Sequence, residues 1–224
     1  ARLVQQTLLP QEIPSPEGWG MSAHYQPANA VGGDFYDLLF FDDGQIGIFV
    51  GDVTDKGVPA ALLMATTRSL LRTVAMSSKA QGDSPGQVLA EVNELLTADI
   101  PPKMFVTCLY ALLDPPTGRL RFANAGHSLP YRSHAGGGPV TELRATGMPL
   151  GLMPGMVYEE RQATIGPGEC VVLYSDGLTE AHNPQREMFG VPRLQGLLGE
   201  CARECPTLIP RLLDELETFT GPKW

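Results

Sequence analysis

Apolar and polar positions along the chain follow a strand-like pattern in several blocks, which are separated by stretches with helical spacing. Runs rich in β-branched and aromatic residues, bounded by Gly, Pro, Asn or Asp, are typical of strands. The turn Asp42-Asp43-Gly44 also predicts a hairpin between two such runs. The predicted strands are 21–27, 34–41, 45–52, 104–113, 119–125, 129–133, 139–144, 157–164 and 169–175.

Helices are predicted where apolar residues recur every three or four positions. Beyond Gly57 this spacing predicts a largely buried helix. The next helix is expected to open at Pro85, after Asp83 and Ser84, and we interpret Asp83 as a cap or turn residue. The predicted helices are 2–9, 58–75, 85–98, 191–198 and 206–219.

The order of these elements predicts an α+β fold, with largely antiparallel sheets and pairs of helices packed outside them. A chain of 224 residues can bury a substantial core and is often a single domain. We expect residues 1–18 to form an N-terminal linker helix and a Pro-rich connector, and residues 19–224 to form the domain.

Charge and hydropathy narrow the classes of function. The net charge of −9 and the pI near 4.9 argue against a nucleic-acid partner and favour a cation. No apolar run approaches the ~18 residues of a membrane span, and the first residues lack the features of a secretory signal. We therefore expect a soluble, cytoplasmic protein without a membrane span.

The four cysteines suggest no disulfide framework. Cys108 and Cys170 lie in apolar strand-like runs, where a buried free thiol is the simpler interpretation. Cys201 and Cys205 share a helix face, but no second Cys or His pair lies near them in the sequence to complete a zinc site.

Acidic residues occur at the predicted strand ends. Asp34 opens a strand after two glycines, while Asp52 and Asp176 each follow an apolar run. Hard divalent cations such as Mg²⁺ and Mn²⁺ take oxygen ligands and keep several waters, so carboxylates from separate strands suit them. The pattern alone leaves two interpretations open, a shared metal site or residues that only form turns.

Six motifs, occurring in order along the whole chain, resemble the SpoIIE-like branch of the PPM metal-dependent serine/threonine phosphatases. They are VGGDFYD, GDVTDKGVPAALLMA, MFVTCLYALLD, ANAGHSLP, GMPLGL and LYSDGLTEA. The resemblance implies a PPM phosphatase-like β-sandwich of two antiparallel sheets flanked by helix pairs, in αββα order, with a site for two Mn²⁺ or Mg²⁺ ions.

By motif matching, the resemblance also implies the ligands of those ions. Asp34 and Asp52 would bind metal, with Asp52 bridging both ions and the Val53 carbonyl contributing, and Asp176 would hold one ion from the other sheet. The two glycines before Asp34 would let the backbone turn closely at the site.

Three further acidic residues are candidates for orienting metal-bound water without binding the metal: Asp37, Asp55 and Glu180. Asp37 and Asp55 suit turns or caps as well.

The activity implied is hydrolysis of phosphoserine or phosphothreonine by a metal-activated water, with no covalent phospho-enzyme. The implied substrate is a regulatory phosphoprotein, a STAS-fold anti-sigma-factor antagonist. The alternative from another class is a catalytically silent regulatory module that keeps the fold and binds such a partner without turnover.

Other polar residues in the motifs have open roles. His127 suits a general acid or, more simply, a packed or anchored side chain, and Lys56 suits a phosphate contact or a solvated loop. Ser175 lacks the neighbouring pattern of a triad serine.

The two ends of the chain carry further expectations. Family members usually continue into a strand opened by Asp-Asp-x-Thr, whose Asp completes the metal site, and the sequence stops at Trp224 before that point. The N-terminal stretch resembles the end of a linker helix, which implies an upstream sensor module and possible homodimerisation through this helix.

Overall fold

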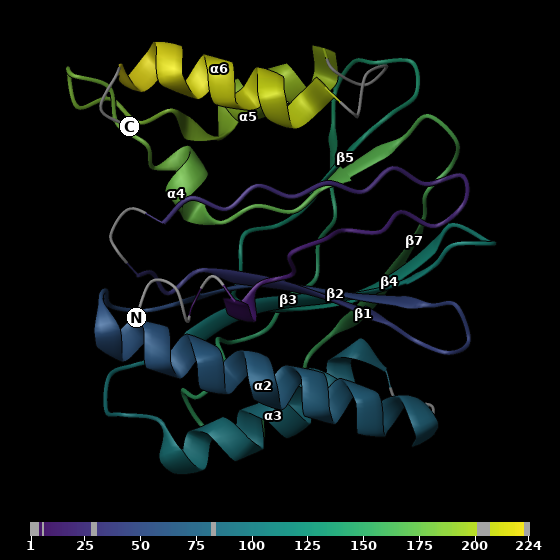
Figure 1. Ribbon diagram of the computed structural model, residues 1–224, viewed down its shortest axis with the longest axis vertical. Helices are drawn as coiled ribbons and strands as arrows, with labels where there is room; N and C mark the ends of the chain where they lie inside the picture. The colour runs from purple at the N-terminus through teal and green to yellow at the C-terminus, as the bar shows by residue number, and fades with distance from the viewer. Residues whose placement is uncertain (1–4, 6, 28–30, 82–83, 201–206, 222–224) are drawn as a thin grey trace. The chain divides into compact units, whose positions relative to one another are not determined.

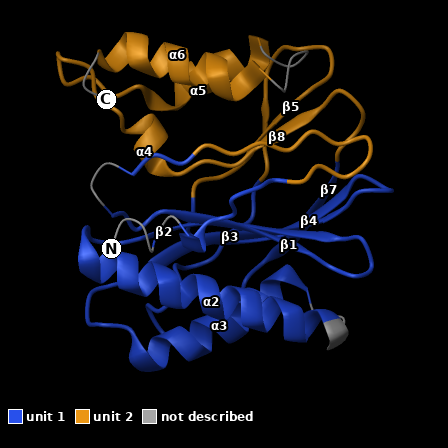
Figure 2. Ribbon diagram, viewed as in Figure 1, with its two compact units in different colours: residues 1–13, 25–127, 144–164 blue, residues 14–24, 128–143, 165–224 orange. Residues whose placement is uncertain are grey.

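The computed structural model describes residues 5, 7–27, 31–81, 84–200 and 207–221. It divides into two compact units (Figure 2). The first comprises residues 1–13, 25–127 and 144–164, and the second comprises residues 14–24, 128–143 and 165–224.

The first unit is built on a five-stranded antiparallel sheet with the strand order β1-β2-β3-β4-β7 (Figure 1). The first four strands are neighbours in chain order, with two helices between β2 and β3, and β7 pairs with the free side of β4. The strands are β1 Phe35–Phe40, β2 Ile46–Val53, β3 Val106–Asp114, β4 Arg119–Ala125 and β7 Glu160–Thr164.

Two helices, α2 (Val58–Gln81) and α3 (Pro85–Asp99), lie along one face of this sheet (Figure 1). Ser84 caps α3 through a capping box in which its side chain accepts from the Gln87 backbone N–H and the Gln87 side chain accepts from the Ser84 N–H. Buried apolar side chains from both helices and from the sheet fill one core, among them Phe35, Phe49, Met64, Leu71, Leu89, Val106 and Leu150.

A buried ion pair joins the sheet to α2. Asp37 is 1% exposed, and its Oδ2 lies 3.0 Å from Nη2 of Arg68 and 2.8 Å from Nη1 of Arg72. Its other oxygen accepts from the Leu38 backbone N–H at 2.9 Å. This carboxylate therefore neutralises two cations that would otherwise face the sheet without a counter-charge.

We expect Asp37→Asn to destabilise the chain by about 2 kcal/mol, because it leaves two partly buried guanidinium groups without their anion. Chemical denaturation monitored by circular dichroism measures the effect. Asp43→Asn is the matched control, since Asp43 pairs with Lys79 on the exposed hairpin and its loss should cost much less. Equal stability of the Asp37 and Asp43 variants would contradict this role.

The second unit has a three-stranded antiparallel sheet with the order β6-β5-β8 and its own core. The strands are β6 Thr141–Glu142, β5 Tyr131–Ser133 and β8 Cys170–Val172. The helices are α4 Asp176–Thr179, α5 Gly190–Glu200 and α6 Leu208–Thr220. Phe189, Leu194, Leu198 and Leu216 are the most buried side chains of this core.

The predicted α+β fold class is confirmed, with two antiparallel sheets and their helices. Most predicted elements appear, and the first long helix continues six residues beyond the predicted end at 75 to Gln81. The predicted strand 21–27 is wrong, because this stretch is mostly exposed and pairs with no strand. The late strand predicted over 169–175 is shorter, since Ser175 becomes the N-cap of α4 and Asp176 its first residue.

The cysteine predictions are settled only in part. Cys108 is a buried free thiol, as predicted, while Cys170 is free but only half-buried. Cys201, Cys205 and Asp83 lie outside the described residues, as does half of the predicted helix 2–9. In the part of the chain that the structure describes, no helix combines the length and apolarity needed to cross a bilayer.

Candidate metal centre

Two of the predicted ligands lie at the same end of the five-stranded sheet. In the β1–β2 pair, Phe35 is opposite Gly51, and the next step of this antiparallel register brings Asp34 opposite Asp52. On the other side of β2, Asp52 is opposite Thr107 of β3. Asp34 directly precedes β1 and Asp52 lies in the paired strand β2, so the two residues lie near the same strand end although they are 18 positions apart in the sequence.

The backbone before Asp34 packs closely against this strand end. A Cβ atom on Gly33 would lie 2.5 Å from the Val53 carbonyl oxygen and 3.0 Å from Oδ1 of Asp52. Real Cβ atoms do not approach a backbone oxygen so closely, so only glycine fits at position 33 without a shift. The same distances show that the Asp52 carboxylate and the Val53 carbonyl converge on one small region.

The pKa of the Tyr25 phenol is sensitive to the negative charge at this end of the sheet. Burial, with the charges of Asp34 and Asp52 as further causes, raises the pKa of its phenol to about 12. The Tyr25 hydroxyl is buried and has no hydrogen-bond partner among the described residues. Two carboxylates and a buried phenol oxygen thus lie close together, an arrangement that a cation would stabilise.

A polar chain supports Asp52 from the neighbouring strands. The Thr107 hydroxyl donates to the Asp52 carbonyl oxygen at 3.3 Å and lies 2.9 Å from Nδ1 of His127. Thr107 therefore links the backbone of Asp52 to the imidazole of His127. Asn124 fixes His127 in turn, accepting from its N–H at 2.7 Å and donating to its carbonyl at 2.9 Å.

These contacts bear on the open roles of the motif residues. The bonds to Thr107 and Asn124 favour an anchored His127 over a general acid. Lys56 is exposed in the turn after β2, and its N–H donates to Oδ1 of Asp55 at 2.8 Å. Asp55 has a φ of 77°, which is typical of a turn residue.

The remaining predicted residues have different surroundings. Asp176 and Glu180 lie in the second unit at the start and the C-cap of α4, where the Glu180 N–H donates to the Asp176 carbonyl at 2.8 Å. Asp37 binds Arg68 and Arg72 instead of facing Asp52. Among the described residues, no three His, Cys, Asp or Glu side chains form a group able to hold a metal ion.

The donor set present fits a hard divalent cation. It offers carboxylate oxygens from Asp34 and Asp52 and one carbonyl oxygen, the type of ligand that hard cations prefer. Magnesium sites commonly use only one or two carboxylates and complete the shell with water and substrate phosphate. Two carboxylates in the first unit are therefore a sufficient start for such a site.

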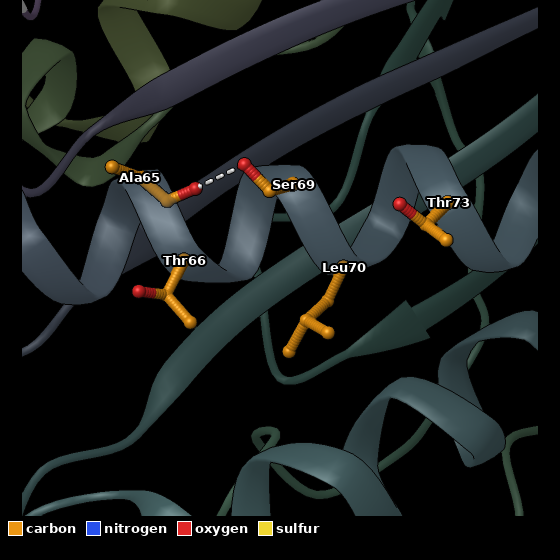
Figure 3. Close-up of a pocket in the computed structure, with 5 residues that line it drawn as sticks. All are labelled: Ala65, Thr66, Ser69, Leu70 and Thr73. Atoms are coloured by element: carbon orange, nitrogen blue, oxygen red, sulfur yellow. Dashed lines mark hydrogen bonds between the residues drawn. The ribbon is translucent and has the colours of Figure 1, made fainter.

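A surface depression elsewhere has a different character. It lies along α2 and is lined by Ala65, Thr66, Ser69, Leu70 and Thr73 (Figure 3). The Ser69 hydroxyl donates to the Ala65 carbonyl at 2.9 Å, within the helix itself. The lining contains no charged group and none of the predicted ligands, so it adds nothing to the metal centre.

Comparison with known proteins identifies the family. The family model of Stage II sporulation protein E (SpoIIE) matches residues 42–223. The chain belongs to the SpoIIE family of PPM-type phosphatase domains. The predicted family is thus confirmed.

Curated relatives are longer than this chain. Protein IcfG of Synechocystis sp. is 32% identical over 220 residues, which are 88% of this chain and 34% of IcfG. Phosphoserine phosphatase RsbU of Bacillus subtilis is 32% identical over 197 residues, which are 88% of this chain and 57% of RsbU. The chain therefore spans between a third and a little over half of these relatives.

Solved structures share the fold. The RsbU and RsbW domains of Rv1364c from Mycobacterium tuberculosis match with a TM-score of 0.72 and 27% identity, over 87% of this chain and 53% of that one. The SiaA-PP2C domain of Pseudomonas aeruginosa matches with a TM-score of 0.82 and 23% identity, over 99% of this chain and 88% of that one. The second likeness supports the fold class alone.

Three residues at the site were missed in the sequence: Gln5, Tyr25 and Thr107. Thr107 lies opposite Asp52 in the β2–β3 register, which the sequence does not reveal because α2 and α3 separate these strands along the chain. Tyr25 was assigned to a strand that does not form, and the contact made by Gln5 spans 27 residues, so no local pattern indicates either.

Proposed function

We propose that this chain hydrolyses phosphoserine or phosphothreonine on a regulatory protein, using water activated by divalent cations at the Asp34–Asp52 end of the sheet. The observation that carries the proposal is the convergence of the Asp52 carboxylate and the Val53 carbonyl on Gly33, with Asp34 opposite Asp52. Family membership supplies the reaction class.

The proposed metal ligands are those that the resemblance implied. Asp34, Asp52, the Val53 carbonyl and Asp176 are the groups that would hold the cations. We propose Mn²⁺ or Mg²⁺ as the cations, and the structure of RsbX in complex with magnesium is compatible with that class. When bound, such cations lower the pKa of water and neutralise charge on the phosphoryl group.

The chain's own residues keep the ligands in position. The absence of a side chain at Gly33 brings the Val53 carbonyl and Asp52 close to the backbone before Asp34. Thr107 holds the Asp52 carbonyl, and His127 and Asn124 hold Thr107. We propose that Asp55 and Glu180 orient water near the site, whereas the role we propose for Asp37 is to hold α2 on the sheet.

The proposed substrate is a phosphorylated STAS-domain protein. Two matched relatives are named phosphoserine phosphatases, RsbU and RsbP of Bacillus subtilis, and the matched Rv1364c structure also contains an RsbW domain. We further propose an upstream sensor module, dimerisation through the N-terminal helix and a cytoplasmic location. The silent binding module is not favoured, because the family's activity-bearing carboxylates at positions 34 and 52 are present and adjacent.

Metal-dependent phosphate release tests the proposal. The purified chain is incubated with a serine-phosphorylated STAS-domain protein, with Mn²⁺ or with EDTA, and released phosphate is measured. We expect release with Mn²⁺, its loss in EDTA and its recovery when Mn²⁺ is added in excess. Equal release in EDTA, or no release under any metal condition, would overturn the proposed function.

A further inference from the structure

Gln5 binds the backbone of the loop that leads to Asp34. Its side-chain Nε2 donates to the Gly32 carbonyl at 2.6 Å, and its Oε1 accepts from the Gly32 N–H at 3.0 Å. The side chain of Gln5 is buried, with the residue 5% exposed. One side-chain amide therefore satisfies both polar groups of one peptide residue 27 positions further along the chain.

This pairing requires an amide. A side-chain amide offers a donor and an acceptor side by side, as a backbone peptide does, whereas an ionised carboxylate offers acceptors only. A buried backbone N–H or carbonyl that loses its partner carries a free-energy penalty. Replacing Gln5 by Leu leaves both groups of Gly32 without their partner, and replacing it by Glu leaves the carbonyl facing an anion.

Gly32 lies directly before the most tightly packed point of the metal centre. The next residue is Gly33, whose backbone leaves no room for a side chain against Val53 and Asp52. A displacement of the Gly32 backbone would therefore also move the backbone of Gly33 and Asp34, because the planar peptide units that join them are rigid.

The same N-terminal segment also holds the chain on the other side of Asp34. The Tyr36 hydroxyl donates to the Pro10 carbonyl at 3.4 Å, and Leu9 is buried in the core of the first unit. Contacts at Gly32 and at Tyr36 thus flank Asp34, and both are made by the segment 5–10.

We propose that Gln5 is a positioning residue for the metal centre, and that the docking of the N-terminal segment on Gly32 sets the affinity of the site for divalent cations. This inference rests on the proposed function, since it assumes that Asp34 and Asp52 bind metal. Gln5 itself contacts neither ligand side chain and acts through the backbone of residues 32–34.

The test compares Gln5→Leu with the unsubstituted chain by isothermal titration calorimetry with Mn²⁺. We expect an affinity about tenfold weaker, the lower end of the effect of removing a group that orients a metal ligand. Gln5→Glu, which keeps the size and one acceptor, is the second variant and should also bind Mn²⁺ more weakly. Gln11→Leu, the same substitution at an exposed position, is the control and should bind like the unsubstituted chain.

Amide hydrogen exchange without metal separates positioning from general destabilisation. We expect faster exchange over residues 31–37 in Gln5→Leu, with α2 and α3 unchanged. Unchanged Mn²⁺ affinity in both Gln5 variants, or faster exchange spread evenly over the first unit, would overturn the inference alone. Failure of the unsubstituted chain to bind Mn²⁺ would overturn the inference together with the proposed function.

Discussion

Asp52→Asn is expected to lower metal-dependent phosphate release by about a thousandfold, equivalent to about 4 kcal/mol of transition-state stabilisation. The substitution keeps the size of the side chain but replaces an anionic ligand by a neutral amide. Asp52 would hold the cations that activate water and neutralise charge on the phosphoryl group, so its loss should remove that chemistry. The substitution keeps the hydrogen bond that the Thr107 hydroxyl donates to the backbone carbonyl of residue 52, so we expect little loss of folding stability.

Steady-state hydrolysis of p-nitrophenyl phosphate with Mn²⁺ measures the loss. Thermal unfolding adds a second readout, because a ligand that binds only the folded state raises the melting temperature, and Asp52→Asn should abolish the rise caused by Mn²⁺. Asp99→Asn, at an exposed position on α3, should behave like the unsubstituted chain. An Asp52→Asn chain with full activity would show that the chemistry occurs elsewhere.

Gly33→Ala is expected to weaken Mn²⁺ binding at least tenfold through the addition of one methyl group. The new Cβ would lie 2.5 Å from the Val53 carbonyl oxygen, a backbone atom that cannot rotate away. The strand end or the loop must therefore move, which separates Asp34 from Asp52 and shifts the carbonyl that we propose as a ligand. Small displacements of first-sphere ligands lower metal affinity strongly.

Calorimetric titration with Mn²⁺ measures this affinity, and circular dichroism verifies that the variant is folded. Gly20→Ala is the matched control, since a Cβ there would meet nothing within 4 Å and the backbone has no positive φ. A Gly33→Ala chain that binds Mn²⁺ as tightly as the control would mean that the close approach at Gly33 is unrelated to the metal.

The strongest periodic patterns in the sequence predicted most of the fold. The β1–β2 hairpin and α3 with its Ser84 cap were predictable because their signals are local: a turn, a capping residue and a regular period. The strand predicted over 21–27 fails because an apolar pattern does not reveal whether a pairing partner exists. Its aromatic residue, Tyr25, lies near the charges of Asp34 and Asp52 instead.

The sequence predicted which residue types form the candidate site better than it predicted their contacts in space. Asp34 and Asp52 were indicated by strand ends and by family motifs, and the antiparallel register places them together. The same local signal also selected Asp37, whose partners Arg68 and Arg72 lie about thirty residues away on α2 and could not be inferred from its neighbours. Gln5 carries no local signal, because both of its bonds go to a distant backbone residue.

The central claim is that Asp34, Asp52 and Asp176 bind the same pair of divalent cations. A crystal structure of the chain grown with Mn²⁺, with anomalous scattering to locate the metal, tests it most directly. We predict two manganese peaks bound by Asp52, with Asp34 and Asp176 each bound to one of the ions. Manganese bound elsewhere, or an Asp34, Asp52 or Asp176 carboxylate far from every peak, would contradict this.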